Sequence, residues 1–418
     1  MSYLAPLAEM RFALEQSAGS AELAALPGFE AAAPDLVETI LVEAARLAET
    51  VLAPLNQPAD RIGSVLENGV VRTPAGFREA YARYAAGGWN GLAFDPDHGG
   101  QGMPLALATA VAEMWNSACM SFALCPMLTA AAIELLQAHG SAEQKRRYLG
   151  RLIAGEWTGT MNLTEPQAGS DLGALRCRAE RRHDAVWGDH YRIAGQKIFI
   201  TYGDHDLAAN IVHMVLARVP GAPPGSRGLS LFVVPKFLPG DEGGLGPRNE
   251  VRVLSLEHKL GIHASPTCVV SYEDAVGWRI GEENRGLEYM FTMMNHARLN
   301  IGLQGVAIAE RALQQARDFA RDRVQGRPLG AAPGAAALPI IHHPDVRRML
   351  LWMRAATEAM RALAYYAAGL VDRGRREADA ARREAARRRE AGPAPGFGRS
   401  REPAGRRVRR SPHPAARH

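Results

Sequence analysis

The chain has 418 residues, of which 47% are hydrophobic, so it is long enough for two or three domains with substantial cores. Its net charge is +5, but residues 373–418 hold 15 Arg against 5 Asp or Glu, whereas residues 1–372 hold 34 basic and 39 acidic residues. The body is therefore mildly acidic, and its composition argues against nucleic-acid binding by the folded part.

The cysteines and the N-terminal sequence both favour a cytoplasmic location. The four cysteines form no C-x-x-C pair and predict buried thiols in a reducing compartment, with neither a disulfide framework nor a metal site: Cys119, Cys125, Cys177 and Cys268. The N-terminus lacks the pattern of a secretory signal, and the most apolar run is too short to cross a bilayer. We expect a cytoplasmic protein without a membrane span.

The first part of the chain predicts helices. From Asp35 to Leu55 the apolar residues keep a helical period, and Asp35 with Glu38 three residues later predicts a capping box. Further helical patterns cover Pro74–Gly87, Leu105–Ala118, Leu128–His139 and Ala142–Ile153. We therefore expect an N-terminal extension over residues 1–34 and a helical domain over residues 35–157.

The middle of the chain predicts strands. Alternating and short apolar runs occupy Tyr191–Ile200, Ile211–Ala217, Leu229–Pro235, Val251–Leu256 and Cys268–Tyr272. Turn residues between these runs are typical of an antiparallel sheet. Strands and helices do not alternate, which argues against a Rossmann-type nucleotide domain. We expect a central antiparallel β-domain over residues 158–277.

Helical periodicity returns at Gly286 and continues to about Gln325, and a second long helix is predicted from about Pro344 to Val371, starting at His343 or Asp345. These helices predict a partial C-terminal helical domain over 278–372, which makes the fold class α+β and multidomain. Residues 373–418 form an Arg/Pro/Gly/Ala-rich tail. Arg373–Glu390 fits a charged helix extension, whereas Ala391–His418 has too few apolar residues to offset its ordering entropy, so we expect disorder there.

Two short motifs carry the functional signal. Residues 164–171 read Thr-Glu-Pro-Gln-Ala-Gly-Ser-Asp, and residues 195–201 read Gly-Gln-Lys-Ile-Phe-Ile-Thr. They resemble the TEPxAGSD and GQKxWIT blocks of the acyl-CoA dehydrogenases, in that family's order and separation. The resemblance covers roughly residues 1–372. It implies the family's fold, FAD as cofactor, α,β-dehydrogenation of an acyl-CoA thioester, and an electron-transfer flavoprotein as acceptor.

The resemblance also implies which residues hold the flavin. Its ring contacts would be Met161, Leu163, Thr164, Phe199 and Thr201. Gly169 would let the backbone approach the flavin, because a side chain would hold it away. Ser170 would contact the flavin diphosphate or the thioester substrate. Taken from the residues alone, the first motif also fits an ordinary turn, and Phe199 also fits core packing in a strand.

Two arginines extend this implied site. Arg298 matches a family arginine near the substrate, although a solvated arginine fits the sequence almost as well. Arg323 resembles an arginine that grips the diphosphate of the flavin in the neighbouring subunit, which implies a homo-oligomer. Segments 161–163, 259–267 and 291–295 resemble a branch that includes bacterial 3-methylmercaptopropionyl-CoA dehydrogenases, which makes 3-methylmercaptopropionyl-CoA a candidate substrate.

The catalytic base that the resemblance implies is missing. Most family members carry the glutamate in a Tyr-Glu-Gly-Thr stretch, and this sequence has none. A minority place it just before the arginine of the long helix, where this chain has Ala297, and no motif assigns Glu310 or Glu358 to the site. The catalytic residue is therefore unassigned.

We hypothesise that the reading frame shifts near Ala385–Ala391. A genuine basic tail that binds anionic lipid or nucleic acid is the alternative. A flavin oxidase or monooxygenase on the same fold and a non-catalytic, truncated flavin-binding remnant remain open as functions.

Overall fold

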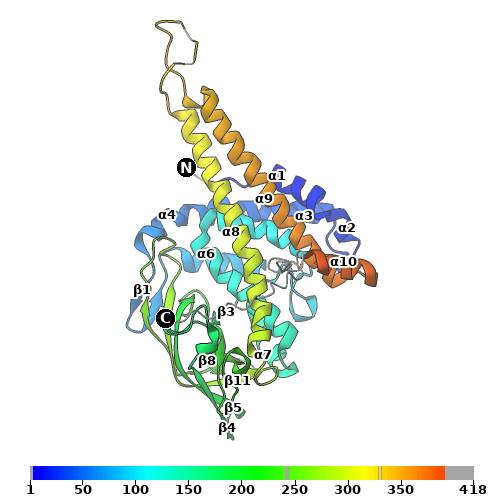
Figure 1. Cartoon of the computed structure of the whole chain (residues 1–418), viewed down its shortest axis with the longest axis vertical. Helices are drawn as coiled ribbons and strands as arrows, with labels where there is room; N and C mark the ends of the chain where they lie inside the picture. Colours follow the sequence, from blue (N-terminus) through cyan, green and yellow to red (C-terminus); the bar gives the residue numbers. More distant parts are fainter. Residues whose placement is uncertain (1–2, 241–243, 328, 331, 391–418) are drawn as a thin grey trace, which may run out of the picture.

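The computed structural model describes residues 3–240, 244–327, 329–330 and 332–390, so the predicted disorder of residues 391–418 lies outside the described residues. Helices from both ends of the chain pack together in one part of the molecule, and the sheet forms the other part (Figure 1). The long helices α6 and α8 connect the two parts, because both contribute to the core that lies against the sheet. The expected order of helical, β and helical regions is confirmed.

The N-terminal part is helical except for one small hairpin. Its helices and strands are α1 (Leu7–Ala13), α2 (Ser20–Ala24), α3 (Pro34–Leu47), α4 (Ala53–Ile62), β1 (Val65–Glu67), β2 (Val70–Arg72), α5 (Phe77–Ala86), α6 (Leu105–His139) and α7 (Ala142–Ile153), with short turns between them. The predicted capping box of α3 is wrong. The helix starts at Pro34, which suits a first helical turn, and Glu38 instead accepts a hydrogen bond from Arg11 at 2.5 Å.

Helix α6 forms the centre of the fold. A kink at Cys119, where φ is −154° and ψ is 89°, divides it, which explains why the sequence predicts two helices there. By length and composition α6 could cross a membrane, but 78% of its most apolar window is buried inside the protein. Among the described residues α6 is therefore a core helix.

The β-domain is built on one seven-stranded sheet. Its strands are β3 (Trp157–Asn162), β4 (Arg178–Asp184), β5 (Gly188–Thr201), β6 (Asn210–Ala217), β7 (Ser230–Pro235), β10 (Val251–Leu256) and β11 (Thr267–Ile280). Between β7 and β10 in the sequence, β8 (Phe237–Pro239) and β9 (Leu245–Arg248) form a separate two-stranded sheet. The expectation of a purely antiparallel sheet is wrong, because β3 and β6 pair in parallel. The β4–β5 hairpin between them carries the chain back, so that β6 runs in the direction of β3.

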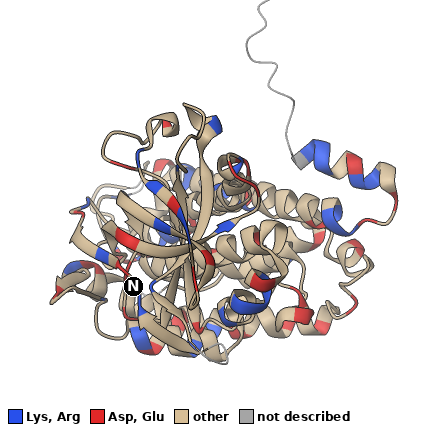
Figure 2. Ribbon diagram, turned by 90° about the horizontal axis from the view of Figure 1, so that it is seen from below, with Lys and Arg blue, Asp and Glu red and all other residues tan. Residues whose placement is uncertain are grey.

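The C-terminal part consists of α8 (Gly286–Asp322), α9 (Pro344–Arg376) and α10 (Ala380–Glu390). Helix α9 begins after His343, as predicted. The charged helix extension expected over Arg373–Glu390 is confirmed, because α9 continues to Arg376 and α10 follows it. Arginines of this segment have partners: Arg375 pairs with Glu134 at 3.1 Å, and Arg387 donates to the Gly374 carbonyl at 3.0 Å. Basic residues crowd α10 (Figure 2), which agrees with the charge of the tail.

Three apolar clusters make the core. One joins the N-terminal helices to α8 and α9, a second joins α6, α7 and α8 to the sheet, and a third lies within the β-domain. All four cysteines are buried and unpaired, as expected. Burial raises the pKa of the Cys119 thiol to about 11, so this thiol stays protonated at neutral pH.

Asp372 of α9 caps the N-terminus of α6. Its carboxylate accepts from the Leu105 and Ala106 amides at 2.8 and 3.0 Å. Burial raises the pKa of Asp372 from 3.8 to about 6, although the two amides lower it. The folded state therefore binds this proton more tightly than the unfolded chain, and the free energy of unfolding that the group contributes falls as the pH rises from about 3.8 to about 6.

We expect Asp372→Asn, which stays neutral, to weaken this pH dependence. Urea denaturation of the parent and the variant at several pH values across that window measures it. The variant should lose less stability than the parent on going from the acid end to the neutral end. If the free energy of unfolding changed equally with pH in the parent and the variant, the raised pKa of Asp372 would be contradicted.

Candidate functional site

Glu165 organises the first motif. The segment from Thr164 to Ala168 leaves β3 as a tight turn, in which the backbone groups of Glu165 and Ala168 bond each other in both directions. The Glu165 carboxylate, 3% exposed, accepts from the Arg176 and Cys177 amides at 2.7 and 3.0 Å. One buried side chain therefore shapes the loop on both sides of Gly169.

Lys197 connects the two motifs. Its fully buried ammonium group donates to the Leu163 carbonyl and to Glu165 Oε1, both at 2.8 Å. Burial alone would raise the pKa of Glu165, but Lys197 and the two amides outweigh it and lower that pKa. The Ile198 amide also donates to the Thr164 carbonyl at 2.9 Å. The turn and strand β5 are therefore held side by side.

Phe199 adopts an unusual backbone conformation on β5. Its φ is +59°, a left-handed value that is strained for an aromatic residue, and the residue is 58% exposed near the end of β5, where the pairing with β11 shifts register. Tyr202, at φ +51°, is buried instead, and its hydroxyl donates to the Ser121 carbonyl at 2.5 Å. Strain of this kind persists where the surrounding structure enforces it, often at ligand sites. Packing in the core, the alternative left open for Phe199, is wrong.

The remaining residues of the implied ring site lie beside Phe199. Met161 and Leu163 are half-buried and pack on the core cluster that includes α8. Thr164 and Thr201 are also half-buried, and Thr160 Oγ1 donates to the Thr201 carbonyl at 2.7 Å, which joins β3 to the end of β5. The structure thus brings these residues to one region of the domain.

Gly169 and Ser170 are exposed on the loop that follows the turn. A Cβ atom at Gly169 would meet only the Thr164 methyl group, at 3.5 Å, which is ordinary contact. The described chain therefore gives no steric reason for glycine here. Asp171 stabilises the loop, because its carboxylate accepts from the Gly173 amide at 2.8 Å.

Arg298 and Arg323 lie on α8 and at its end. Arg298 is exposed, donates to Asn295 at 2.8 Å and lies over the Phe291 ring at 5.3 Å, two turns from residues of α8 that pack with Met161. Arg323 follows the last residue of this helix, which is ~55 Å long, at the end away from the sheet (Figure 1). Arg323 therefore lies too far away to complete the Phe199 site within one subunit.

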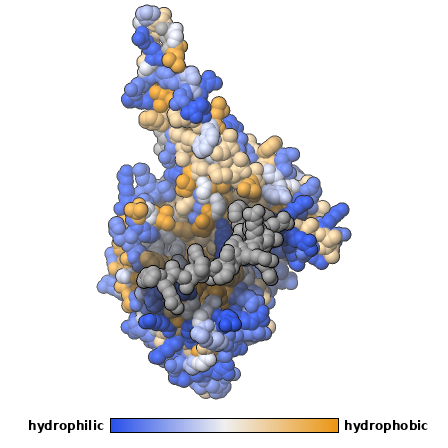
Figure 3. Space-filling view, viewed as in Figure 1, coloured by the Kyte–Doolittle hydropathy of each residue, from blue (hydrophilic) through white to orange (hydrophobic). Residues whose placement is uncertain are grey.

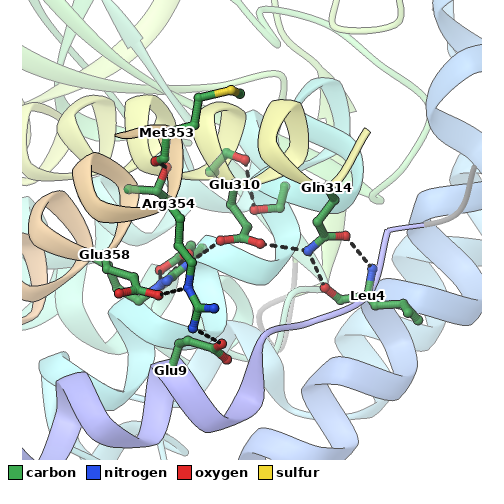
Figure 4. A network of polar contacts seen from close by, with 12 residues as sticks. Leu4, Glu9, Glu310, Gln314, Met353, Arg354 and Glu358 are labelled. Carbon is green, nitrogen blue, oxygen red and sulfur yellow. Dashed lines mark hydrogen bonds and ion pairs between the residues drawn. The ribbon is translucent and has the colours of Figure 1, made fainter. Parts of the chain in front are cut away.

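The structure assigns Glu310 and Glu358 to ion pairs. Glu310 accepts from the buried Arg361 at 2.8 Å and from Gln314 at 2.8 Å, while Glu358 pairs with Arg354 at 2.6 Å (Figure 4). Ala297 is half-buried, and its neighbour His296 pairs with Glu134 at 3.2 Å. Burial would raise the pKa of Glu134, but His296 and Arg375 hold it at about 2. These carboxylates are committed to structural partners.

Sequence reasoning missed the residues that hold the site together. Glu165 and Lys197 lie inside the quoted motifs, but nothing in the sequence shows that their side chains pair. Arg218 was also missed, although it donates to the carbonyls of Gly173 and Leu175, just after the first motif. A basic residue directly after a largely apolar strand was the one signal that could have identified it.

The helical, β and helical fold, with the Thr164 turn and the strained Phe199 at one site, agrees with the resemblance that the two motifs carry. Three family models match the chain: the acyl-CoA dehydrogenase N-terminal domain over residues 37–156, the middle domain over 160–275 and the C-terminal domain over 284–387. The chain belongs to the acyl-CoA dehydrogenase family.

Individual relatives agree with this assignment. The chain is 50% identical over 385 residues to 3-methylmercaptopropionyl-CoA dehydrogenase of Ruegeria pomeroyi, covering 92% of this chain and 65% of that protein. It is 39% identical over 350 residues to a butyryl-CoA dehydrogenase of Syntrophomonas wolfei, covering 81% and 57%. It therefore spans less than two thirds of the length of these relatives. The structure of butyryl-CoA dehydrogenase from Megasphaera elsdenii shares the fold, with a TM-score of 0.65 at 23% identity over 82% and 84% of the chains.

The residues present fit the family's cofactor. Acyl-CoA dehydrogenases are FAD-dependent oxidoreductases. A planar ring needs an exposed aromatic or apolar surface and a backbone that it can approach, and Phe199, the half-buried Met161 and the open position at Gly169 supply these features. The site therefore suits a flavin.

Proposed function

We propose that the chain binds FAD against the surface that the Thr164 turn and strand β5 form together, and that it oxidises an acyl-CoA thioester at its α and β carbons. The observation that carries the proposal is the exposed, strained Phe199 beside the Thr164 turn, joined through the Ile198–Thr164 hydrogen bond. Met161, Leu163, Thr164, Phe199 and Thr201 would hold the ring. Gly169 would let the backbone approach the flavin, Ser170 would contact the flavin diphosphate or the thioester, and Arg298 would lie near the substrate.

Bound FAD would supply the acceptor for the β-hydride. The chain's own part is to hold the ring, exclude water and orient the thioester carbonyl. Ala297 carries no titratable group, and Glu310 and Glu358 are held in ion pairs. The α-proton therefore lacks a positioned acceptor among the described residues, and we expect turnover ~10²–10⁴-fold below that of a form with a glutamate in place.

Two measurements test this function. A purified protein with a flavin absorbance band supports the pocket, and dye-coupled assays on a panel of acyl-CoAs measure turnover. The comparison is a form in which the hypothesised frame shift near Ala385–Ala391 is reversed. Equal activity of both forms would contradict the missing base, oxygen uptake without dye would favour the oxidase or monooxygenase, and a colourless protein would favour the non-catalytic remnant.

The substrate we propose is 3-methylmercaptopropionyl-CoA. The 50% identity to the Ruegeria pomeroyi enzyme supports it over the butyryl-CoA suggested by the more distant relative. Competition between the two thioesters in the same assay distinguishes them. We also propose an electron-transfer flavoprotein as acceptor, which family membership supports, and a cytoplasmic location, which the four buried, unpaired cysteines support.

Phe199 provides a direct test of the flavin site. Phe199→Gly should keep or raise the stability of the flavin-free chain, by up to about 1 kcal/mol, because it removes a conformation that costs on the order of 1–3 kcal/mol. It should weaken flavin retention, because the ring contact is lost. Thermal melts and flavin release by dialysis measure both effects. The matched control is Asn68→Gly, which changes another left-handed residue in the β1–β2 turn and should leave flavin retention unchanged.

We further propose that the chain forms a homo-oligomer through α8 and α9, in which Arg323 reaches the flavin diphosphate of a neighbouring subunit. Apolar surface extends over this helix pair (Figure 3), and it includes Phe319, Leu351, Trp352 and Leu363, each more than half exposed. Trp352→Lys should lower the mass measured by sedimentation equilibrium. The control is Val186→Lys, because Val186 is 74% exposed on the distant β4–β5 turn. Equal masses for both variants would contradict the interface.

A further inference from the structure

Two glycine-containing loops meet beside Ser170. We call residues 169–175 the first loop and residues 221–228 the second loop. A Cβ atom at Gly173 would lie 3.3 Å from the Gly225 Cα and 2.8 Å from Asp171 Oδ1, so the loops touch backbone to backbone. At Gly228 a Cβ would lie 1.8 Å from the Pro223 carbonyl oxygen. Gly228 therefore has no room for a side chain, and a side chain at Gly173 would displace the Asp171 carboxylate and crowd the second loop.

Arg218, at the end of β6, joins the two loops. Its Nε donates to the Leu175 carbonyl at 2.7 Å, and its Nη2 donates to the Gly173 and Gly225 carbonyls at 2.5 and 2.8 Å. Its Nη1 donates to the Pro223 carbonyl at 3.1 Å. One guanidinium group therefore bonds four carbonyls, two from each loop.

The backbone of Arg218 holds this group in place. Its amide donates to the Cys177 carbonyl at 2.8 Å, and its carbonyl accepts from the Ala179 amide at 2.7 Å. The side chain thus begins from a fixed point in the sheet and reaches both loops. Lysine cannot substitute, because an ammonium group has three donors at one atom, whereas the guanidinium presents five in a planar fork.

We propose that Arg218 is a positioning residue that fixes the first loop, and with it Ser170, for binding a CoA thioester. This inference rests on the proposed function. Arg218 does not touch the ligand in this arrangement; it acts through the Gly173 and Leu175 carbonyls, three and five residues after Ser170. Because the second loop shares the same guanidinium, the two loops keep one fixed arrangement.

The test uses two variants. Arg218→Lys removes the planar guanidinium, and Gly173→Ala adds a methyl group that pushes the first loop away from the second. The matched control is Arg311→Lys, because Arg311 also donates to two backbone carbonyls, those of Ser117 and Ala118, but in the helical part. Amide hydrogen exchange of residues 169–175 reports loop order without any ligand. Calorimetric titrations with 3-methylmercaptopropionyl-CoA and with butyryl-CoA give the Kd of each thioester, and the flavin absorbance of each sample gives its cofactor content.

We expect both loop variants to speed exchange of residues 169–175 and to raise the Kd at least about 10-fold, with flavin content and the control unchanged. Unchanged exchange in both variants would overturn the positioning role even if the proposed function stands. Faster exchange with an unchanged Kd would overturn the link to the thioester. A parent chain that retains flavin but binds no thioester would overturn both this inference and the proposed substrate class.

Discussion

Lys197→Met is expected to destabilise the β-domain and to release the flavin. The change leaves the Glu165 carboxylate, 3% exposed, without its cation. Removing one partner of a buried ion pair costs about 3–5 kcal/mol, and we expect the lower end here because two backbone amides still donate to Glu165. Urea denaturation and flavin absorbance after gel filtration measure the two effects.

Two further variants make this test specific. Arg285→Met breaks a surface pair with Glu288 and should leave both readouts unchanged, because exposed pairs contribute little. The double variant Lys197→Met, Glu165→Leu should recover part of the lost stability, because it removes the unpaired charge. Flavin retention should stay low in the double variant, since the Leu163 carbonyl and the turn lose their anchor. Full flavin retention in Lys197→Met would contradict the role of Lys197 in holding the turn and β5 together at the flavin site.

Arg361→Met is expected to loosen the contact between α9 and the rest of the helical region. The Arg361 side chain is 1% exposed and bonds Glu113 at 2.7 and 2.9 Å and Glu310 at 2.8 Å, and Tyr365 donates to the same Glu113 at 2.7 Å. Gln314 extends the network to the backbone of Leu4 (Figure 4). Without the guanidinium two buried carboxylates face each other, so we expect a loss of about 3–5 kcal/mol.

The measurement is again urea denaturation, and the control is Arg348→Met, because Arg348 lies on the same helix, is 70% exposed and pairs only with Asp345 in the described structure. A stability equal to that of the control would contradict a central role for this network.

The sequence predicts the order of regions and the place of the site, because both depend on local patterns. The helical spacing of apolar residues locates α8 and α9. The two motifs, at residues 164–171 and 195–201, locate the turn and β5. The positive φ of Phe199 could not be predicted, since an aromatic residue disfavours it and only the surrounding sheet enforces it. The same limit applies to the parallel pairing of β3 with β6, which depends on where the β4–β5 hairpin returns the chain. Pairing of Glu165 with Lys197 likewise depends on topology.

The cap that Asp372 places on α6 has a consequence for the nascent chain. During synthesis α6 leaves the ribosome more than 230 residues before its capping carboxylate, and Glu113 waits about as long for Arg361. The N-terminal helices therefore cannot complete their packing when they are synthesised. Their apolar surface stays exposed to solvent while the residues of the sheet are being synthesised. Such late closure slows folding and exposes the intermediate to aggregation, so chaperone supply should govern the soluble yield of this protein.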